Sequence, residues 1–319
     1  MKILREVPER KGQYRNPVVT LGSFDGVHLG HRRIFSTVLN LARAKGGDPI
    51  VLTFSTHPRK VLTPRTPPRI LTTIDEKLTA IGECGIENVI VLDFTAQMAG
   101  MNAEDFLGDI VLGKLGIIDF VVGYDHAFGK NREGTVDFLR DISKARGFAV
   151  TRVEPKNFYS RPVSSSWIRT EIEDGNVNLA NMLLGRKYSL HGTVVHGAGR
   201  GGGMLGFPTA NLVPDDQDKV IPKDGVYAVT VRLGGEAKTR PGMLNIGTNP
   251  TFSNTERTIE VNIFDFSGDL YGIGVDLYFF ERMRDEQRFP SAGLLVEQLH
   301  RDKTAALEIL DAHVTGGRK

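Results

Sequence analysis

The sequence predicts an α/β fold followed by a β fold: a doubly wound α/β domain, then a small antiparallel β-barrel domain with a C-terminal helix. In the first half, short apolar runs alternate with stretches whose apolar residues recur at helical spacing. In the second half, short β-branched and aromatic runs are separated by Gly, Pro and Asp, and one helical pattern comes last. A length of 319 residues also favours two domains over one.

The first half is expected to form a parallel sheet, because strands that alternate with helices are joined by right-handed crossovers. Ligands of such sheets bind at the carboxyl ends of the strands. Strands are predicted at 17–21, 49–54, 88–92, 120–123 and 148–153. Helices are predicted around 34–42, after a capping box of Thr73 and Glu76, from Asn102, and over 135–146.

The second half begins after two short helices, predicted at 165–174 and 178–184. The change of pattern near Gly185 divides the chain into predicted domains 1–185 and 186–319. Barrel strands are predicted at 188–195, 226–233, 243–246, 258–266 and 275–280, and the terminal helix at 291–313.

Composition excludes several classes of protein. The net charge is +2, with 24 basic and 21 acidic residues in 1–185 and 16 and 17 in the rest, so no nucleic-acid partner is expected. No apolar run of about 18 residues occurs, so no membrane partner is expected either. The charged, proline-broken N-terminus is not a signal peptide, and the single Cys84 excludes an internal disulfide. A cytoplasmic enzyme fits these features.

The first chemical signal is the segment 20–31, which leaves a predicted strand and enters a predicted helix. Its sequence ends Gly-Val-His-Leu-Gly-His, with His28 and His31 at the helix start. Free backbone N–H groups there favour phosphate, and two imidazoles can stabilise a transferring phosphoryl group. A structural histidine pair is the alternative, and a zinc site lacks the further ligands it needs.

A second phosphate signal lies at 163–169, where three serines precede Arg169 at a helix start. Hydroxyl groups, the helix dipole and a guanidinium together suit a phosphate. An N-cap serine beside a solvated arginine is the alternative.

The second half carries its own signals. Residues 196–206 contain six glycines, typical of either a flexible hairpin or a phosphate-covering loop, and Gly-Phe-Pro-Thr-Ala-Asn follows at 206–211. Thr209 and Asn211 offer oxygen ligands for a magnesium ion, although a plain turn into a strand would look similar. Glu260 is a charged residue among apolar neighbours in a predicted strand, where it could equally face solvent or pair with a cation.

These motifs resemble a known family. Segment 22–31 resembles the His-x-Gly-His nucleotidylyltransferase superfamily, and its Phe-Asp-Gly-Val-His form resembles the prokaryotic bifunctional riboflavin kinase/FAD synthetases. Segments 52–58, 122–129 and 163–169 are similar to further motifs of that family, with Thr56 in place of proline and Ser166 in place of threonine. Without the resemblance, His57 and His126 would be ordinary surface-loop histidines. The similarity continues through 206–211, 224–228, 245–251, 258–262, 266–272 and 284–289, and covers about residues 18–303.

The resemblance implies a Rossmann-like nucleotidylyltransferase fold for the first domain and a riboflavin kinase barrel for the second. It assigns catalysis to His28, His31, Arg169 and Glu260, with Glu260 as the general base. ATP and its phosphates would contact Gly22, Ser23, Phe24, Gly30, Ser164, Ser165, Ser166, Gly197, Gly199, Arg200, Gly201 and Gly206. Flavin would contact Phe54, Asp125, Phe128, Arg284 and Phe289, and Mg²⁺ would attend both ATP molecules, with Thr209 and Asn211 at the kinase ion.

The expected function is therefore synthesis of FMN from riboflavin and of FAD from FMN, with ATP as co-substrate and pyrophosphate released in the second step. FMN and FAD are then product ligands. Two alternatives remain: a kinase whose first domain adenylylates another phosphate ester, and a flavin-binding regulator without turnover. The regulator is disfavoured because His28, His31, Thr209, Asn211 and Glu260 are all present.

Overall fold

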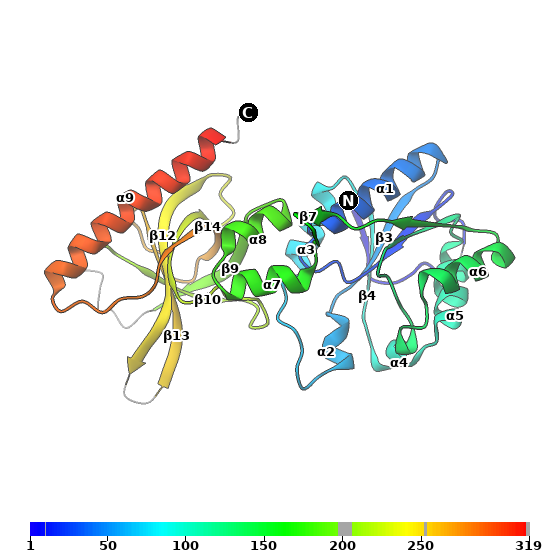
Figure 1. Cartoon of the computed structure of the whole chain (residues 1–319), viewed down its shortest axis with the longest axis horizontal. Helices are drawn as coiled ribbons and strands as arrows, with labels where there is room; N and C mark the ends of the chain where they lie inside the picture. Colours follow the sequence, from blue (N-terminus) through cyan, green and yellow to red (C-terminus); the bar gives the residue numbers. More distant parts are fainter. Residues whose placement is uncertain (10, 197–205, 252–253, 317–319) are drawn as a thin grey trace. The chain divides into compact units, whose positions relative to one another are not determined.

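The computed structural model describes residues 1–9, 11–196, 206–251 and 254–316. The chain forms two compact units, Met1–Ser165 and Ser166–Lys319 (Figure 1). Each unit has its own sheet and its own buried hydrophobic clusters.

The first unit is built on a parallel sheet in the order β1-β4-β3-β2-β5-β6. Chain order reverses between β2 and β5, which makes their carboxyl ends the topological switch point of the sheet. The predicted strands are confirmed to within one residue, whereas β1, a short edge strand with two exposed residues, was not predicted. The strands are β1 (Lys2–Leu4), β2 (Val18–Leu21), β3 (Pro49–Phe54), β4 (Asn88–Leu92), β5 (Asp119–Gly123) and β6 (Ala149–Val153).

Side-chain caps fix where the helices of this unit begin. The predicted capping box is confirmed: the Thr73 backbone N–H donates to Glu76, and the Glu76 N–H donates to the Thr73 hydroxyl. The longer helices are α1 (Leu29–Ala44), α3 (Ile74–Glu83), α5 (Ala103–Asp105) with the π-helix η1 (Phe106–Leu115), and α6 (Val136–Arg146). Short elements that show no periodicity in the sequence are α2 (Pro58–Leu62), α4 (Ala96–Gly100), η2 (Lys130–Arg132), β7 (Asn157–Phe158) and β8 (Arg161–Pro162).

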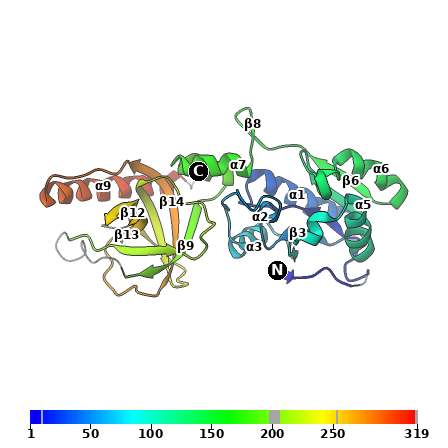
Figure 2. The same cartoon turned by 90° about the horizontal axis from the view of Figure 1, so that it is seen from below.

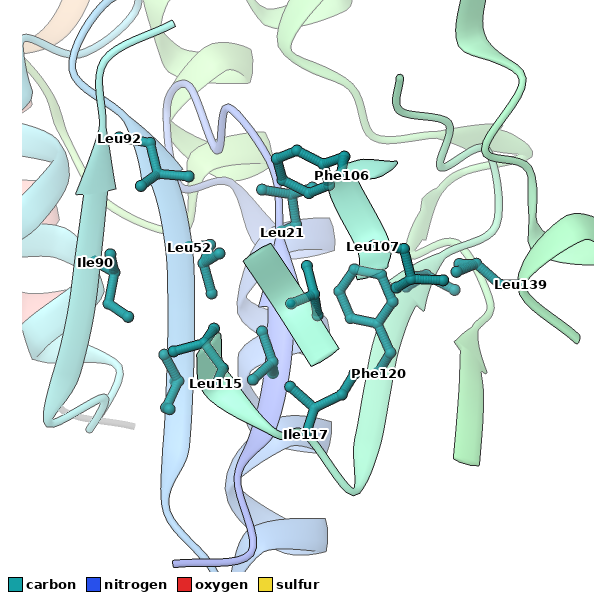
Figure 3. Close-up of a cluster of buried hydrophobic side chains, with 14 of the residues drawn as sticks. Leu21, Leu52, Ile90, Leu92, Phe106, Leu107, Leu115, Ile117, Phe120 and Leu139 are labelled. Atoms are coloured by element: carbon teal, nitrogen blue, oxygen red, sulfur yellow. The ribbon is translucent and has the colours of Figure 1, made fainter. Parts of the chain in front are cut away.

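Alternate residues of the central strands enter two different cores. On one face Leu21 and Leu52 pack with Phe106 and Leu115 of the α5–η1 segment (Figure 3). On the other face Val18, Val51 and Val89 pack with side chains of α1 and α3. Apolar burial on both faces is what a doubly wound sheet requires, and it confirms the predicted fold class.

The second unit contains a closed antiparallel barrel in the order β10-β13-β12-β11-β14-β9. The long helix α9 (Ala292–Gly316) packs along β11, β12 and β14 (Figure 2). Strand β12 is longer than predicted because its prolines and glycines concealed its ends, and the short β10 was not predicted. The strands are β9 (Tyr188–Val195), β10 (Ala210–Pro214), β11 (Gly225–Leu233), β12 (Thr239–Thr251), β13 (Asn254–Ile263) and β14 (Gly274–Arg284).

Two further helices precede the barrel in this unit, α7 (Ser165–Glu173) and α8 (Val177–Leu184). Buried Asn181 of α8 donates to the carbonyl of Phe279 and accepts from the backbone N–H of Tyr188, at 2.9 and 2.6 Å. These bonds attach α8 to β14 and β9. The domain boundary between residues 185 and 186 stays a prediction. The second compact unit begins at Ser166.

Among the residues that the structure describes, no helix is long and apolar enough to cross a membrane.

Candidate active sites in the two units

The turn after β2 has an unusual backbone. Phe24 and Val27, both buried, have φ values of 47° and 41°, in the left-handed region that side chains other than glycine rarely adopt. Gly22 must lack a side chain, because a Cβ there would lie 2.9 Å from the Phe24 ring. Such strain persists only where the surroundings hold it, and it gathers at functional sites.

Asp25 provides much of that hold. Its carboxylate is 4% exposed and accepts from the backbone N–H groups of Leu71 and Thr72, each at 3.0 Å, and from the Thr72 hydroxyl at 3.1 Å. The same hydroxyl accepts from the N–H of Gly26 at 3.0 Å. The turn is therefore fastened to the segment before α3. No local sequence pattern indicates this role for Asp25, because its partners lie 46 and 47 residues away in the chain.

His28 and His31 are brought together at the start of α1. His28 is the N-cap, and its Nδ1 accepts from the backbone N–H groups of Gly30 and His31 at 3.1 and 3.4 Å. In the neutral ring the proton then lies on Nε2, which can donate to an anion. The two rings stack with centroids 3.6 Å apart, and the His31 ring meets Phe24 edge-on at 5.2 Å.

The second predicted phosphate segment lies beside this turn. The Ser165 hydroxyl donates to the backbone carbonyl of Asp25 at 2.9 Å, and a Cβ on Gly30 would lie 3.6 Å from the carbonyl of Val163. Ser164 belongs to the same segment. Ser166 and Arg169 fall in the second compact unit, where Arg169 lies on α7 one turn after Ser165 and is 9% exposed.

The predicted flavin contacts of the first unit have different surroundings. Phe54 ends β3 inside the core, against Phe94, while Asp125 follows β5 and is exposed. Phe128 packs among aromatic rings, so its side chain already has partners within the protein. His126 is no simple surface residue: its ring lies against Phe120 and Phe128, and burial lowers its pKa to about 4, with Arg132 contributing.

Lys77 of α3 also reaches the carboxyl edge of this sheet. Its Nζ donates to the carbonyls of Phe54 and Ser23, at 2.6 and 3.2 Å, and its side chain is buried. The Ser23 carbonyl thus connects the turn after β2 to α3. Nothing in the helical spacing of 74–83 distinguishes Lys77 from a solvent-facing lysine.

In the barrel, Glu260 occupies the centre of a row of polar residues. It pairs in register with Asn211 of β10 on one side and with Asn245 of β12 on the other. Directly opposite residues of antiparallel strands share one face of the sheet, so the three side chains project together. Asn245 in turn donates to Glu286 at 3.2 Å. Asn245 and Glu286 were not among the predicted site residues, since strand pairing is not visible in the sequence.

The environment of Glu260 suits a base. Burial raises the pKa of its carboxyl, a hydrogen bond with Thr209 lowers it, and the negative charge of Glu286 raises it. Glu286 approaches the barrel over Gly247, where a Cβ would overlap its carboxylate.

Two cavities meet at the segment 206–211. One, of about 350 Å³, is lined by Thr209 and Asn211, by apolar residues of β9 and β13, and by the loop 266–271. The other, of about 460 Å³, is lined by Gly206, Phe207, Asn262, His300 and Lys303, among others. Buried Asn262 donates to the carbonyl of Pro208 at 2.6 Å, and this bond holds the segment 206–211 between the two cavities.

The other predicted kinase residues lie at the end of β14, shortly after it, and in the glycine-rich segment 196–206. The Arg284 guanidinium forms a two-point ion pair with buried Asp302 of α9 and lies 5.9 Å from the Phe289 ring centroid. Gly206 has a φ of 70°. Gly197, Gly199, Arg200 and Gly201 lie outside the described residues.

The oxygen donors of the barrel fit magnesium. Within the described ranges, no group of three or more His, Cys, Asp or Glu residues is arranged to hold a metal ion, so His28 and His31 lack zinc co-ligands there. Thr209 and Asn211 present hard oxygen atoms beside Glu260, and such donors suit Mg²⁺ when substrate phosphates complete its shell.

A strained glycine-bearing turn holds paired histidines, and the barrel holds a half-buried carboxylate bonded to Thr209, which lines a cavity. Together these features indicate a class: a two-unit phosphotransferase and nucleotidyltransferase. Comparison with known proteins specifies it further. Residues 10–167 match the family model "FAD synthetase", and residues 184–310 match the model "Riboflavin kinase".

Curated relatives match along nearly the whole chain. The bifunctional riboflavin kinase/FMN adenylyltransferase of Bacillus subtilis (strain 168) is 36% identical over 93% of both chains. The protein of the same name from Escherichia coli (strain K12) is 35% identical over 97% of both chains. A solved structure described as a macrolide-efflux protein from Streptococcus pneumoniae has 33% identity and a TM-score of 0.85, covering 96% of this chain and 98% of its own. The chain belongs to the bifunctional riboflavin kinase/FMN adenylyltransferase family, which confirms the resemblance read from the motifs.

Proposed function

We propose that the chain makes flavin cofactors in two consecutive reactions. The barrel unit phosphorylates riboflavin with ATP to give FMN, and the α/β unit adenylylates FMN with a second ATP to give FAD and pyrophosphate. The observation that carries this proposal is the presence of two separate constellations, Glu260 with Thr209 and Asn211 in one unit and His28 with His31 in the other, within one chain of this family.

In the kinase step, a terminal ribityl hydroxyl attacks the γ-phosphorus of ATP. Glu260 takes the hydroxyl proton, the new O–P bond forms, and ADP leaves with the electrons of the broken bond. The raised pKa of Glu260 supports this role, because a carboxylate that holds a proton more readily is a better base. The two cavities that meet at 206–211 support the binding of two substrates, ATP and riboflavin.

In the adenylylation step, a phosphate oxygen of FMN attacks the α-phosphorus of ATP and pyrophosphate departs, so no proton has to be removed. His28 donates from Nε2 and, with His31, stabilises the charge that develops on the phosphoryl oxygens. The segment 164–165 lies beside the turn that bears these histidines, where the Ser165 hydroxyl donates to the carbonyl of Asp25, and its contacts with ATP are proposed by family resemblance. Arg169 and the flavin contacts at Phe54, Asp125 and Phe128 remain proposals by family resemblance.

Magnesium belongs to the proposal for both ATP molecules. Thr209 and Asn211 would hold the kinase ion, whose charge helps to neutralise the phosphates. We also place the protein in the cytoplasm, for which its single cysteine is the support.

The direct test is a product assay. Purified protein incubated with riboflavin, ATP and Mg²⁺ is expected to form FMN first and FAD later, with flavins separated by chromatography over time. FMN without FAD would contradict the adenylyltransferase half and leave the alternative of another phosphate-ester acceptor. Absence of FMN would contradict the kinase half.

A further inference from the structure

Lys77 is a buried charged side chain that the reaction steps above do not use. It is only 6% exposed, and its Nζ donates to two backbone carbonyls, those of Ser23 and Phe54. A buried ammonium has to be compensated, and a neutral apolar side chain would avoid the cost of desolvating it. The positions of the two carbonyl acceptors indicate the role of the Lys77 ammonium group.

Both carbonyls lie where a strand leaves the sheet. The ladder between β2 and β3 has its last register pair at Leu21 and Leu52, and the N–H of Gly22 then donates to Leu52 at 3.1 Å. Beyond that point the Ser23 carbonyl accepts from the Thr53 hydroxyl and from Lys77. The ammonium therefore joins the ends of β2 and β3 after the regular pairing has stopped.

The histidine-bearing turn is consequently held on both sides of its first strained residue. Ser23, held by Lys77, precedes Phe24, and Asp25, held by the backbone of Leu71 and Thr72, follows it. Both anchors come from the segment 71–77, which contains the capping box at the start of α3. His28 follows Asp25 by only three residues, so a displacement of the turn would also displace the His28 ring.

The charge of Lys77 is balanced locally. Burial lowers its pKa to about 8, and the negative charge of Asp25 raises it. Asp25 acts on Lys77 through its charge, and the carbonyls of Ser23 and Phe54 supply the hydrogen bonds. At pH 7 the side chain is thus still an ammonium, able to donate to both strand ends at once.

We propose that Lys77 is a positioning residue for adenylyl transfer: by joining the carbonyls of Ser23 and Phe54 it sets the turn that aims His28 and His31 at the α-phosphate. This inference rests on the proposed adenylyltransferase function. A positioning residue acts through the histidines, so its loss is felt in the transition state more than in substrate binding.

The test compares Lys77→Met with Lys45→Met. The Lys45 side chain is 34% exposed and forms an ion pair with buried Asp119 at 2.7 Å, at the opposite, amino edge of the sheet. For Lys77→Met, kcat for FMN adenylylation is expected to fall about tenfold or more, with KM for ATP and FMN within about twofold, since small misplacements cost rate. Lys45→Met is expected to lower the unfolding temperature and leave that kcat unchanged. Riboflavin phosphorylation by the same molecules serves as the internal control and should not change in either variant.

Thr53→Val provides a second measurement, should Lys77→Met fail to fold as judged by far-ultraviolet circular dichroism. It removes the other donor to the Ser23 carbonyl and is expected to lower the same kcat by a smaller factor. An unchanged kcat in folded Lys77→Met, an unchanged kcat in Thr53→Val, or an equal loss in Lys45→Met would overturn the proposal. Wild-type protein that forms no FAD would instead contradict the proposed function, so the two failures are distinguishable.

Discussion

At the scale of single residues, the kinase unit depends on two carboxylates with different surroundings. Glu260 is half-buried and bonded to Thr209, whereas Glu286 is exposed and is held by Asn245. Burial and the charge of Glu286 both raise the pKa of Glu260 above the ordinary glutamate value. A base is lost when it is protonated, so the kinase rate should fall with falling pH at a higher pH than an ordinary glutamate would give.

Glu286→Gln is expected to move that acid limb to lower pH. The substitution removes a negative charge and keeps the shape, so it lowers the pKa of Glu260 and keeps the base ionised further into acid. The measurement is kcat/KM for riboflavin phosphorylation between pH 4.5 and 8, a range chosen to bracket ordinary and raised carboxyl pKa values. If the limb stays in place, Glu286 does not act on Glu260.

Single residues could be predicted only where their motif is local in the sequence. His28, His31, Ser165 and Glu260 could be selected because their motifs are local in sequence. Asp25 and Lys77 could not be given their roles, because their partners are distant in the chain and meet them only after the sheet forms. Arg284 could be named from its motif, but its ion pair with Asp302 depends on how α9 packs.

At the scale of elements, periodicity identified the central strands and the long helices, since each buries a continuous face. It missed β1, β7 and β8, which are too short to show a period, and β10, which begins inside the segment 206–211 that was interpreted as a ligand site or a turn. It also shortened β12, whose glycines and prolines resemble turns. Helix α8 was found in the sequence, but its attachment to the barrel through Asn181 was not.

Asn181→Ala should therefore destabilise the barrel unit. It leaves a buried carbonyl and a buried N–H without this partner, and at roughly 1–3 kcal/mol for each group the free energy of unfolding should fall by about 2–6 kcal/mol. The single tryptophan, Trp167, lies buried in α7 of the same unit, so its fluorescence during urea unfolding reports on that unit. Met182→Ala, at an exposed neighbouring position of α8, is the matched control and should change stability little. Equal effects from the two variants would show that α8 is not fastened through Asn181.

At the scale of the whole molecule, each compact unit carries one of the two constellations of candidate site residues. The paired histidines belong to the parallel sheet, and Glu260 belongs to the closed barrel. A near-neutral net charge is compatible with this arrangement, because small phosphorylated substrates are held by local donors and need no extended basic surface. A single substitution in one constellation should therefore abolish one reaction and leave the other intact.

The most direct test uses Glu260→Ala and His31→Ala with riboflavin or FMN supplied in turn. Glu260→Ala is expected to block formation of FMN while still converting supplied FMN to FAD, and His31→Ala is expected to form FMN but little FAD. Removal of a group that acts in the transition state commonly costs about a hundredfold or more, so chromatographic quantification of FMN and FAD resolves both effects. Loss of both reactions in either folded variant would contradict the assignment of one independent active site to each unit.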